Sequence, residues 1–180
     1  MGRLAWLDGI LGFARGDRQA IHAARLATSE SGHPQADLID RSLAAFDRAL
    51  RGDRKGAGRD LAELEQHCLR HESCQSFTPH IAVQRLAAGE WLREAGEAET
   101  ASRLLRWQDA RGIPWVRWWM NYKSVLDGPA YLARARLAET LGSPSKAREY
   151  YEQFLQRYDQ PMPSQKHLVE EARAALARLP

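Results

Sequence analysis

The stretch Tyr131-Leu-Ala-Arg-Ala-Arg-Leu-Ala-Glu-Thr-Leu-Gly-Ser-Pro-Ser-Lys-Ala-Arg-Glu-Tyr-Tyr-Glu-Gln-Phe-Leu155 carries the pattern of two helices joined by a tight turn. Gly142 stands at its centre, where a glycine in the left-handed conformation can end the first helix. Ala135 lies seven positions before this glycine and Ala147 lies five positions after it. Small side chains at such offsets let two antiparallel helices approach closely. The stretch therefore predicts a helical hairpin.

The same pattern occurs four times along the chain. The turn glycines are Gly16, Gly52, Gly96 and Gly142. Seven positions before them and five positions after them stand mostly small residues: Gly9 and Ile21, Ala45 and Ala57, Gly89 and Ala101, Ala135 and Ala147. Two turns also carry an aspartate, Asp17 or Asp53, placed to cap the second helix. We expect four hairpins, at about 3–32, 35–73, 79–111 and 129–160, and a capping helix at 164–179.

Apolar residues recur at helical spacing in most of these segments, and such stripes turn one face of a helix inward. The predicted core-facing stripes are Leu4, Leu7, Leu11 and Ala14; Ile39, Leu43, Phe46 and Leu50; Ala57, Leu61, Leu64 and Cys68; and Ala147, Tyr151, Phe154 and Tyr158. Strong helix formers dominate the 180 residues and no segment alternates with period two. The sequence therefore predicts a single all-α domain.

The stretch 131–155 resembles a tetratricopeptide repeat (TPR). Ala135 matches the small position of its first helix, Gly142 the turn, and Ala147 and Tyr151 the small and aromatic positions of its second helix. The unit from Arg85 to Gly112 is similar, and together the two units resemble the C-terminal TPR arrays of bacterial Ser/Thr kinases and transcriptional regulators. The resemblance implies a right-handed α-solenoid of about four hairpins.

The resemblance also implies a non-catalytic scaffold or regulatory module that binds a peptide or helix of a partner protein. Two alternatives remain for the chain itself, a part of a larger multidomain regulator or a stand-alone relative. Some members of the family clamp a peptide C-terminus with asparagine and lysine on the first helices of successive repeats. The only asparagine here is Asn121, outside those positions, so we expect the partner to be held in another way.

An aromatic insertion interrupts the repeat pattern. The turn glycines are separated by 36, 44 and 46 residues, whereas a TPR takes about 34. Trp115, Trp118, Trp119 and Tyr122 share one helical face within the last interval. They predict an extra helix at about 114–126, ended by Gly128-Pro129, or an extension of the helix that follows.

Such an aromatic face has to pack on something, because burying it removes a large apolar area from water. It can pack on the chain's own core beside Trp91 and Trp107. Alternatively it contacts a partner, with Arg117 alongside, since Trp, Tyr and Arg are favoured interface anchors. In a third alternative the helix covers a pocket for a small molecule, and the domain is a sensor.

Metal binding is a further alternative. His67, His71 and Cys74 would share one face of a continuing helix, at a spacing that can surround Zn²⁺. The structural alternative is that Cys68 continues a buried stripe with the two histidines at its border. We expect no cofactor.

Other motifs are better explained by structure than by chemistry. Arg15-Gly-Asp17 and Arg51-Gly-Asp53 spell an adhesion tripeptide but occupy predicted interhelical turns. The basic residues Arg51, Arg54, Lys55 and Arg59 are interrupted by aspartates and have no interleaved aromatic. No nucleophile, acid–base pair or phosphate loop emerges at a telling spacing, so neither nucleic-acid binding nor catalysis is expected.

Composition agrees with a cytoplasmic protein, and the resemblance to bacterial regulators implies a bacterial one. The net charge is only +3 and 44% of the residues are hydrophobic. No window is apolar enough for a membrane span or a signal peptide. Two cysteines do not make a disulfide framework.

Overall fold

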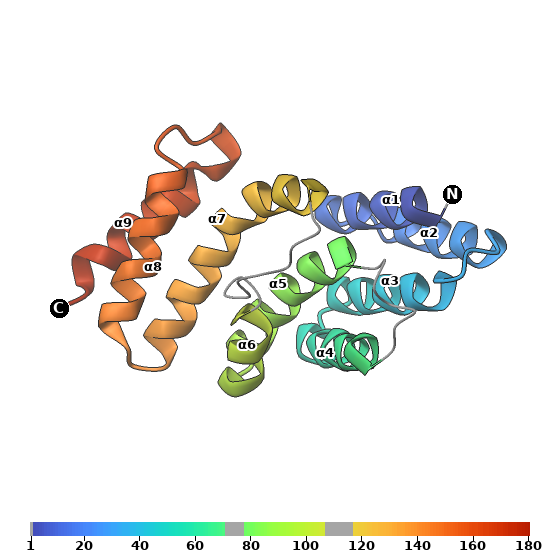
Figure 1. The fold of residues 1–180 in the computed structure, drawn as a ribbon, viewed down its shortest axis with the longest axis horizontal. Helices are drawn as coiled ribbons and strands as arrows, with labels where there is room; N and C mark the ends of the chain where they lie inside the picture. Colours follow the sequence, from blue (N-terminus) through green and yellow to red (C-terminus); the bar gives the residue numbers. More distant parts are fainter. Residues whose placement is uncertain (1, 71–77, 107–116) are drawn as a thin grey trace. The chain divides into compact units, whose positions relative to one another are not determined.

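The computed structural model describes the backbone of residues 2–70, 78–106 and 117–180, and the side chains of 4–68, 82–106 and 126–180. Within these ranges the chain forms nine α-helices and one 3-10 helix, and no strand. The elements are α1 (Gly2–Arg15), α2 (Arg18–Glu30), α3 (Ala36–Leu50), α4 (Arg54–Arg70), α5 (Thr78–Glu94), α6 (Ala98–Leu105), α7 (Arg117–Thr140), α8 (Pro144–Arg157), η3 (Pro163–Gln165) and α9 (Lys166–Arg178). Helices that follow one another pack in pairs (Figure 1). The all-α prediction is confirmed.

The contacts divide the chain into two compact units, Met1–Ala95 with α1 to α5 and Gly96–Pro180 with α6 to α9. None of the helices in the described ranges combines the length and the apolar character needed to cross a membrane.

The four predicted turns are confirmed in position and conformation. Gly16, Gly52, Gly96 and Gly142 have φ of 71°, 96°, 81° and 64°, in the left-handed region that L side chains rarely adopt. Each glycine lies between the end of one helix and the start of the next. The small residues at the flanking offsets are all buried, as close helix approach requires.

The aspartates after the first two turn glycines cap the next helix. Asp17 Oδ1 accepts hydrogen bonds from the backbone N–H groups of Gln19 and Ala20, both at 3.0 Å. Asp53 Oδ1 accepts one from Gly56 N at 2.8 Å. Each carboxylate thus satisfies N–H groups that lack a partner within their own helix. Both Arg-Gly-Asp tripeptides therefore have a structural role.

The core of the first unit follows the predicted stripes of α3 and α4. Leu43 and Leu61 are almost completely buried, and Phe46 packs between Phe13 and Trp91, with ring centroids 4.9 and 5.7 Å away. A buried ion pair joins α4 to α5, because Arg85 Nε lies 2.5 Å from Glu65 Oε1.

The buried face of α1 differs from the prediction. Leu4, Leu7 and Leu11 are 68%, 47% and 42% exposed, so the leucine stripe faces outward. Gly9 and Gly12 are buried instead. A Cβ atom at Gly9 would collide with Leu43 of α3, which shows how closely the two helices approach. The reason for the error is that the smallest residues of α1, and not the largest, mark its packed face.

The second unit has its core between α7, α8 and α9. Its buried members are Leu132, Ala135, Ala138, Ala147, Tyr151, Phe154, Val169, Ala172 and Ala175. Tyr151 Oη donates a hydrogen bond to Glu139 Oε2 at 2.5 Å. Two parallel 2.7 Å bonds from Arg136 to Glu171 tie α7 to α9. The last helix thus packs on the final hairpin, as expected of a capping helix.

Helix α7 passes through Gly128-Pro129 without ending, so the predicted break there is wrong and the alternative of an extended helix is right. An internal proline costs about 3 kcal/mol, and contacts that α8 makes with the two residues before it help to offset this cost. The carboxylate of Asp127 lies 3.0 Å from Arg157 of α8, and Gly128 packs against the ring of Tyr158. Figure 1 shows α7 changing direction part of the way along its length.

Candidate functional site

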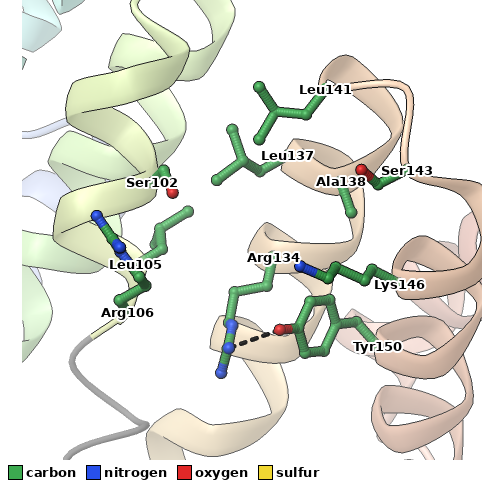
Figure 2. A pocket seen from close by; sticks show the side chains of 10 residues that line it. All are labelled: Ser102, Leu105, Arg106, Arg134, Leu137, Ala138, Leu141, Ser143, Lys146 and Tyr150. Carbon is green, nitrogen blue, oxygen red and sulfur yellow. Dashed lines mark hydrogen bonds between the residues drawn. The ribbon is translucent and has the colours of Figure 1, made fainter.

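A cavity of about 210 Å³ lies in the second unit, between α6, α7 and α8 (Figure 2). Its lining residues are Ser102, Leu105 and Arg106 of the α6 segment, Arg134, Leu137, Ala138 and Leu141 of α7 and its end, and Ser143, Lys146 and Tyr150 at the start of α8. In each segment these positions belong to an i, i+3, i+4, i+7 pattern, so each helix contributes a single face. We call this cavity the α6–α8 pocket.

The floor of the pocket is apolar. Leu105, Leu137 and Ala138 are at most 5% exposed. In Figure 2 Leu105 and Leu137 point toward one another from α6 and α7. Leu141, in contrast, is 52% exposed and offers an apolar contact at the mouth of the pocket.

Arg134 is held in place by an aromatic ring. Its Nη2 donates a hydrogen bond to Tyr150 Oη at 2.6 Å, and its Cζ lies 4.3 Å from the centroid of the same ring. Tyr150 in turn stacks on Tyr131, with centroids 6.4 Å apart, and Arg157 lies over Tyr131 at 5.4 Å. The four side chains alternate between α7 and α8 and form an arginine–tyrosine ladder along the seam of the pair. The ladder fixes the orientation of the Arg134 guanidinium.

Positive charge dominates the polar part of the pocket. Its lining includes Arg106, Arg134 and Lys146 and no carboxylate. Within the part of the chain that the structure describes, neither Arg106 nor Lys146 makes an ion pair. The hydroxyls of Ser102 and Ser143 add hydrogen-bond donors. The pocket is therefore suited to an anionic group with an apolar neighbour.

A second cavity, of about 300 Å³, lies in the first unit, and its positive charges are neutralised by neighbouring carboxylates. Its arginines Arg41, Arg48 and Arg51 lie beside carboxylates that neutralise them. Arg48, for example, lies 2.8 Å from Asp60 and 2.6 Å from Asp53, and these hydrogen bonds raise the pKa of its guanidinium, Asp60 first. This arginine cluster is internally paired and offers little net charge to a ligand.

The aromatic residues that the sequence singled out are placed only in part. Trp91 is 7% exposed and lies 5.8 Å from Phe13 and 5.7 Å from Phe46, within the core of the first unit. Trp107 and Trp115 lie outside the described residues. Three more, Trp118, Trp119 and Tyr122, belong with Arg117 to the first turns of α7, where only the backbone is described. The role of this aromatic face stays a prediction.

The suggested metal ligands are likewise only partly described. His67 lies on α4 next to the buried Cys68, whereas His71 and Cys74 lie outside the described residues. Cys68 has the place in the core that its apolar stripe predicted. Elsewhere in the described chain no three His, Cys, Asp or Glu side chains come together as a metal site would require.

The basic residues beside the second turn are engaged with acids in the first unit. Arg51 lies 3.4 Å from Asp47 and Arg54 lies 3.6 Å from Glu94. Lys55 and Arg59 each make an interaction as well. These contacts agree with the structural explanation of this stretch.

The α6–α8 pocket was not predicted from the sequence. One signal was available, because Arg134 heads the stripe Leu137, Ala138 and Leu141 on a single face of α7. A cation on an otherwise apolar face is unusual, since charged side chains are seldom buried without a partner. The rest of the pocket depends on how three helices meet, which the residue pattern does not encode.

Comparison with known proteins gives this chain no relative, since no protein-family model, no curated protein and no solved structure matches it.

Proposed function

We propose that the chain is a TPR-like helical-repeat module that binds a short segment of a partner protein and catalyses no reaction. The paired helices, the left-handed turn glycines and the buried small residues support a repeat architecture. Four hairpins stacked as a right-handed solenoid are part of the proposal. A cytoplasmic bacterial scaffold or regulator is the setting that it suggests.

The observation that carries this function is the α6–α8 pocket. Its volume of about 210 Å³ is below the roughly 300–1,000 Å³ of pockets that enclose drug-sized ligands. Such a space suits one or two side chains of a peptide. A solid apolar floor beneath a polar rim is the usual anatomy of an interface anchor site.

The half-exposed Leu141 allows a test that spares the fold. We expect Leu141→Ser to reduce the recovery of a partner in a pull-down with mass spectrometry, while the melting temperature stays close to that of the wild type. Leu26→Ser is the matched control, because Leu26 is 55% exposed on α2 of the other unit and Leu141 is 52% exposed. Equal recovery of every specific protein by wild type and both variants would contradict binding at the pocket.

The aromatic face of α7 is a second contact in this proposal. Replacing Trp118 and Trp119 together with Ala should then abolish capture of the same partner and leave the helical circular dichroism signal intact. A fall of several degrees in melting temperature would instead assign the two tryptophans to the core, in agreement with the structural alternative.

A further inference from the structure

We infer that the α6–α8 pocket selects a partner segment in which an acidic side chain stands next to a large apolar side chain. The inference rests on the proposed function and names the chemistry of the segment. It is carried by the two-part lining of the pocket, in which Arg106 and Lys146, which make no ion pair within the described residues, border an apolar floor.

Charge complementarity identifies the acidic component. Arg106 and Lys146 are exposed and make no ion pair within the described chain. The lining supplies no carboxylate to offset them. A carboxylate beside either cation would gain charge-assisted hydrogen bonds, whereas a cationic segment would be repelled.

The geometry of Arg134 adds directional selectivity. Its hydrogen bond and ring contact with Tyr150 fix the guanidinium before any ligand arrives. A pre-oriented donor loses less conformational entropy on binding than a free arginine does. Lys146 extends its ammonium from α8 toward α7 on a flexible stem (Figure 2). Arg134 therefore supplies a cation of fixed orientation, and Lys146 supplies one whose position can adjust.

The floor identifies the apolar component. Leu105, Leu137 and Ala138 present carbon to the interior of the pocket and Leu141 does so at its mouth. An anion without an apolar neighbour would leave this surface wet, and an apolar side chain without an anion would desolvate cations that it cannot pair. Both costs disappear when the two groups are adjacent in the segment.

An internal acidic residue fits better than a chain terminus or a nucleic acid. Only Arg134 lies on the first helix of a hairpin, whereas Arg106 follows α6 and Lys146 lies on α8, so the cations do not stand on the first helices of successive hairpins. Nucleic acid binding would need a longer basic track with free aromatic rings for stacking. Here the ring of Tyr150 is engaged by Arg134 and Tyr131.

The test is a phage-display selection, in which a library of random peptides is selected for binding to the whole immobilised protein. Wild type should enrich peptides with Asp or Glu within two positions of Leu, Ile or Phe. The variant Arg106→Glu with Lys146→Glu should enrich Lys or Arg instead. The control variant reverses the same number of exposed charges on α9, with Lys166→Glu and Arg173→Glu, and should select the same peptides as the wild type.

Synthetic copies of the wild-type peptides, with amidated C-termini, then give affinities by fluorescence polarisation. We expect the pocket double variant to bind these peptides about tenfold more weakly than the wild type, or weaker still. The control variant should bind them with unchanged affinity, and binding to the wild type should weaken at high salt. Circular dichroism melts of both double variants establish that they fold.

Each other outcome is decisive. Peptides that bind the pocket double variant as tightly as wild type would overturn the acidic–apolar inference and leave peptide binding intact. Failure of the wild type to enrich any peptide would overturn the proposed function itself. Binding of a single-stranded oligonucleotide that the pocket double variant loses, without acidic enrichment in the peptide pool, would assign the pocket to nucleic acid and refute the inference.

Discussion

Tyr150 of α8 receives both a hydrogen bond and a stacked guanidinium from Arg134 of α7, with Nη2 at 2.6 Å from Oη and Cζ at 4.3 Å from the ring centroid. Substitution of Tyr150 can separate the hydrogen bond from the contact between the guanidinium and the ring. The pairing of the two residues also connects the stability of the α7–α8 pair to the shape of the α6–α8 pocket, because both residues line that pocket. The packing of the hairpin and the orientation of a binding residue thus depend on one pair.

Tyr150→Leu should lower the free energy of unfolding more than Tyr150→Phe does. Tyr150→Phe keeps the ring and loses the hydrogen bond, which should cost about 1 kcal/mol at this partly buried site. Tyr150→Leu also loses the cation–π contact and should cost a further 0.5–1 kcal/mol, roughly. Urea unfolding of the wild type and both variants measures the order. Equal stability of the Phe and Leu variants would mean that ring stacking contributes nothing.

Helix α1 offers a contrast between its packed and exposed faces. Gly9→Val should destabilise the first unit by about 1–3 kcal/mol through overpacking, because even a Cβ atom would lie 3.3 Å from Ala24 and collide with the fully buried Leu43. Leu7→Gln, at a 47% exposed position, should change the free energy of unfolding by less than about 0.5 kcal/mol. If the leucine variant proves the more costly, α1 packs through its leucine stripe after all.

The sequence predicted well those parts of the fold that depend on the conformation or the burial of single residues. The turn at Gly142 depends on a backbone conformation that glycine favours. The stripe of Leu61 and Leu64 depends on the burial of large apolar side chains. Both can be predicted from the types of the individual residues. The face of α1 was assigned wrongly because Gly9 packs by its lack of a side chain. The end predicted at Pro129 was wrong because contacts from α8, distant in sequence, hold α7 together.

The candidate site was less predictable for the same reason. Arg134 and Tyr150 stand sixteen residues apart and on different helices, and neither belongs to a recognisable motif. Their contact depends on the relative rotation of α7 and α8. The repeat pattern gives the existence of that hairpin but not which polar side chains face each other across it.

The conformation of a turn glycine can be tested separately from its packing. At Gly142 the φ is 64° and a Cβ atom would meet nothing within 4 Å. Gly142→Ala should therefore destabilise the second unit by about 1–2 kcal/mol through backbone strain alone. Gly142→Asn should cost less, because asparagine tolerates the left-handed region. Thermal melts of the two variants compare them, and a more costly asparagine would argue against strain.

Asp47 should make the stability of the first unit depend on acid pH. A hydrogen bond from Arg18, at 2.8 Å, is the main reason why its pKa is lower than usual, and the charge of Arg51 adds to the effect. A lowered folded pKa stabilises the native state above the unfolded pKa of about 3.9, and this contribution is lost as the pH falls through the folded pKa. We expect Asp47→Asn to cost at most about 1 kcal/mol at pH 7, because Arg18 is exposed.

The measurement is the difference in unfolding free energy between wild type and Asp47→Asn from pH 7 to pH 2. This difference should shrink at the acid end. Asp8→Asn, at an exposed position on α1, is the control that removes one negative charge from the same unit. A difference that stays constant with pH would mean that the substitution acts through something other than the charge of Asp47.

Gly128 and Tyr158 should be energetically coupled. A Cβ atom at Gly128 would collide with the Tyr158 ring, whose Cζ and Oη would both lie 2.9 Å away, and that ring is held against Phe154 at 4.7 Å. Gly128→Ala should therefore cost about 1–3 kcal/mol in the wild-type chain. In a Tyr158→Ala background the obstacle is gone, and alanine should instead stabilise α7 by up to about 1 kcal/mol through its helix propensity.

A double-mutant cycle measured by urea unfolding gives the coupling between the two positions. The sign of the Gly128→Ala effect should reverse between the two backgrounds. An equal cost in both would show that the glycine is needed for the backbone beside Pro129 and not for the approach of Tyr158. The reversal, in contrast, would establish that the close approach of the Tyr158 ring is what requires a glycine at position 128.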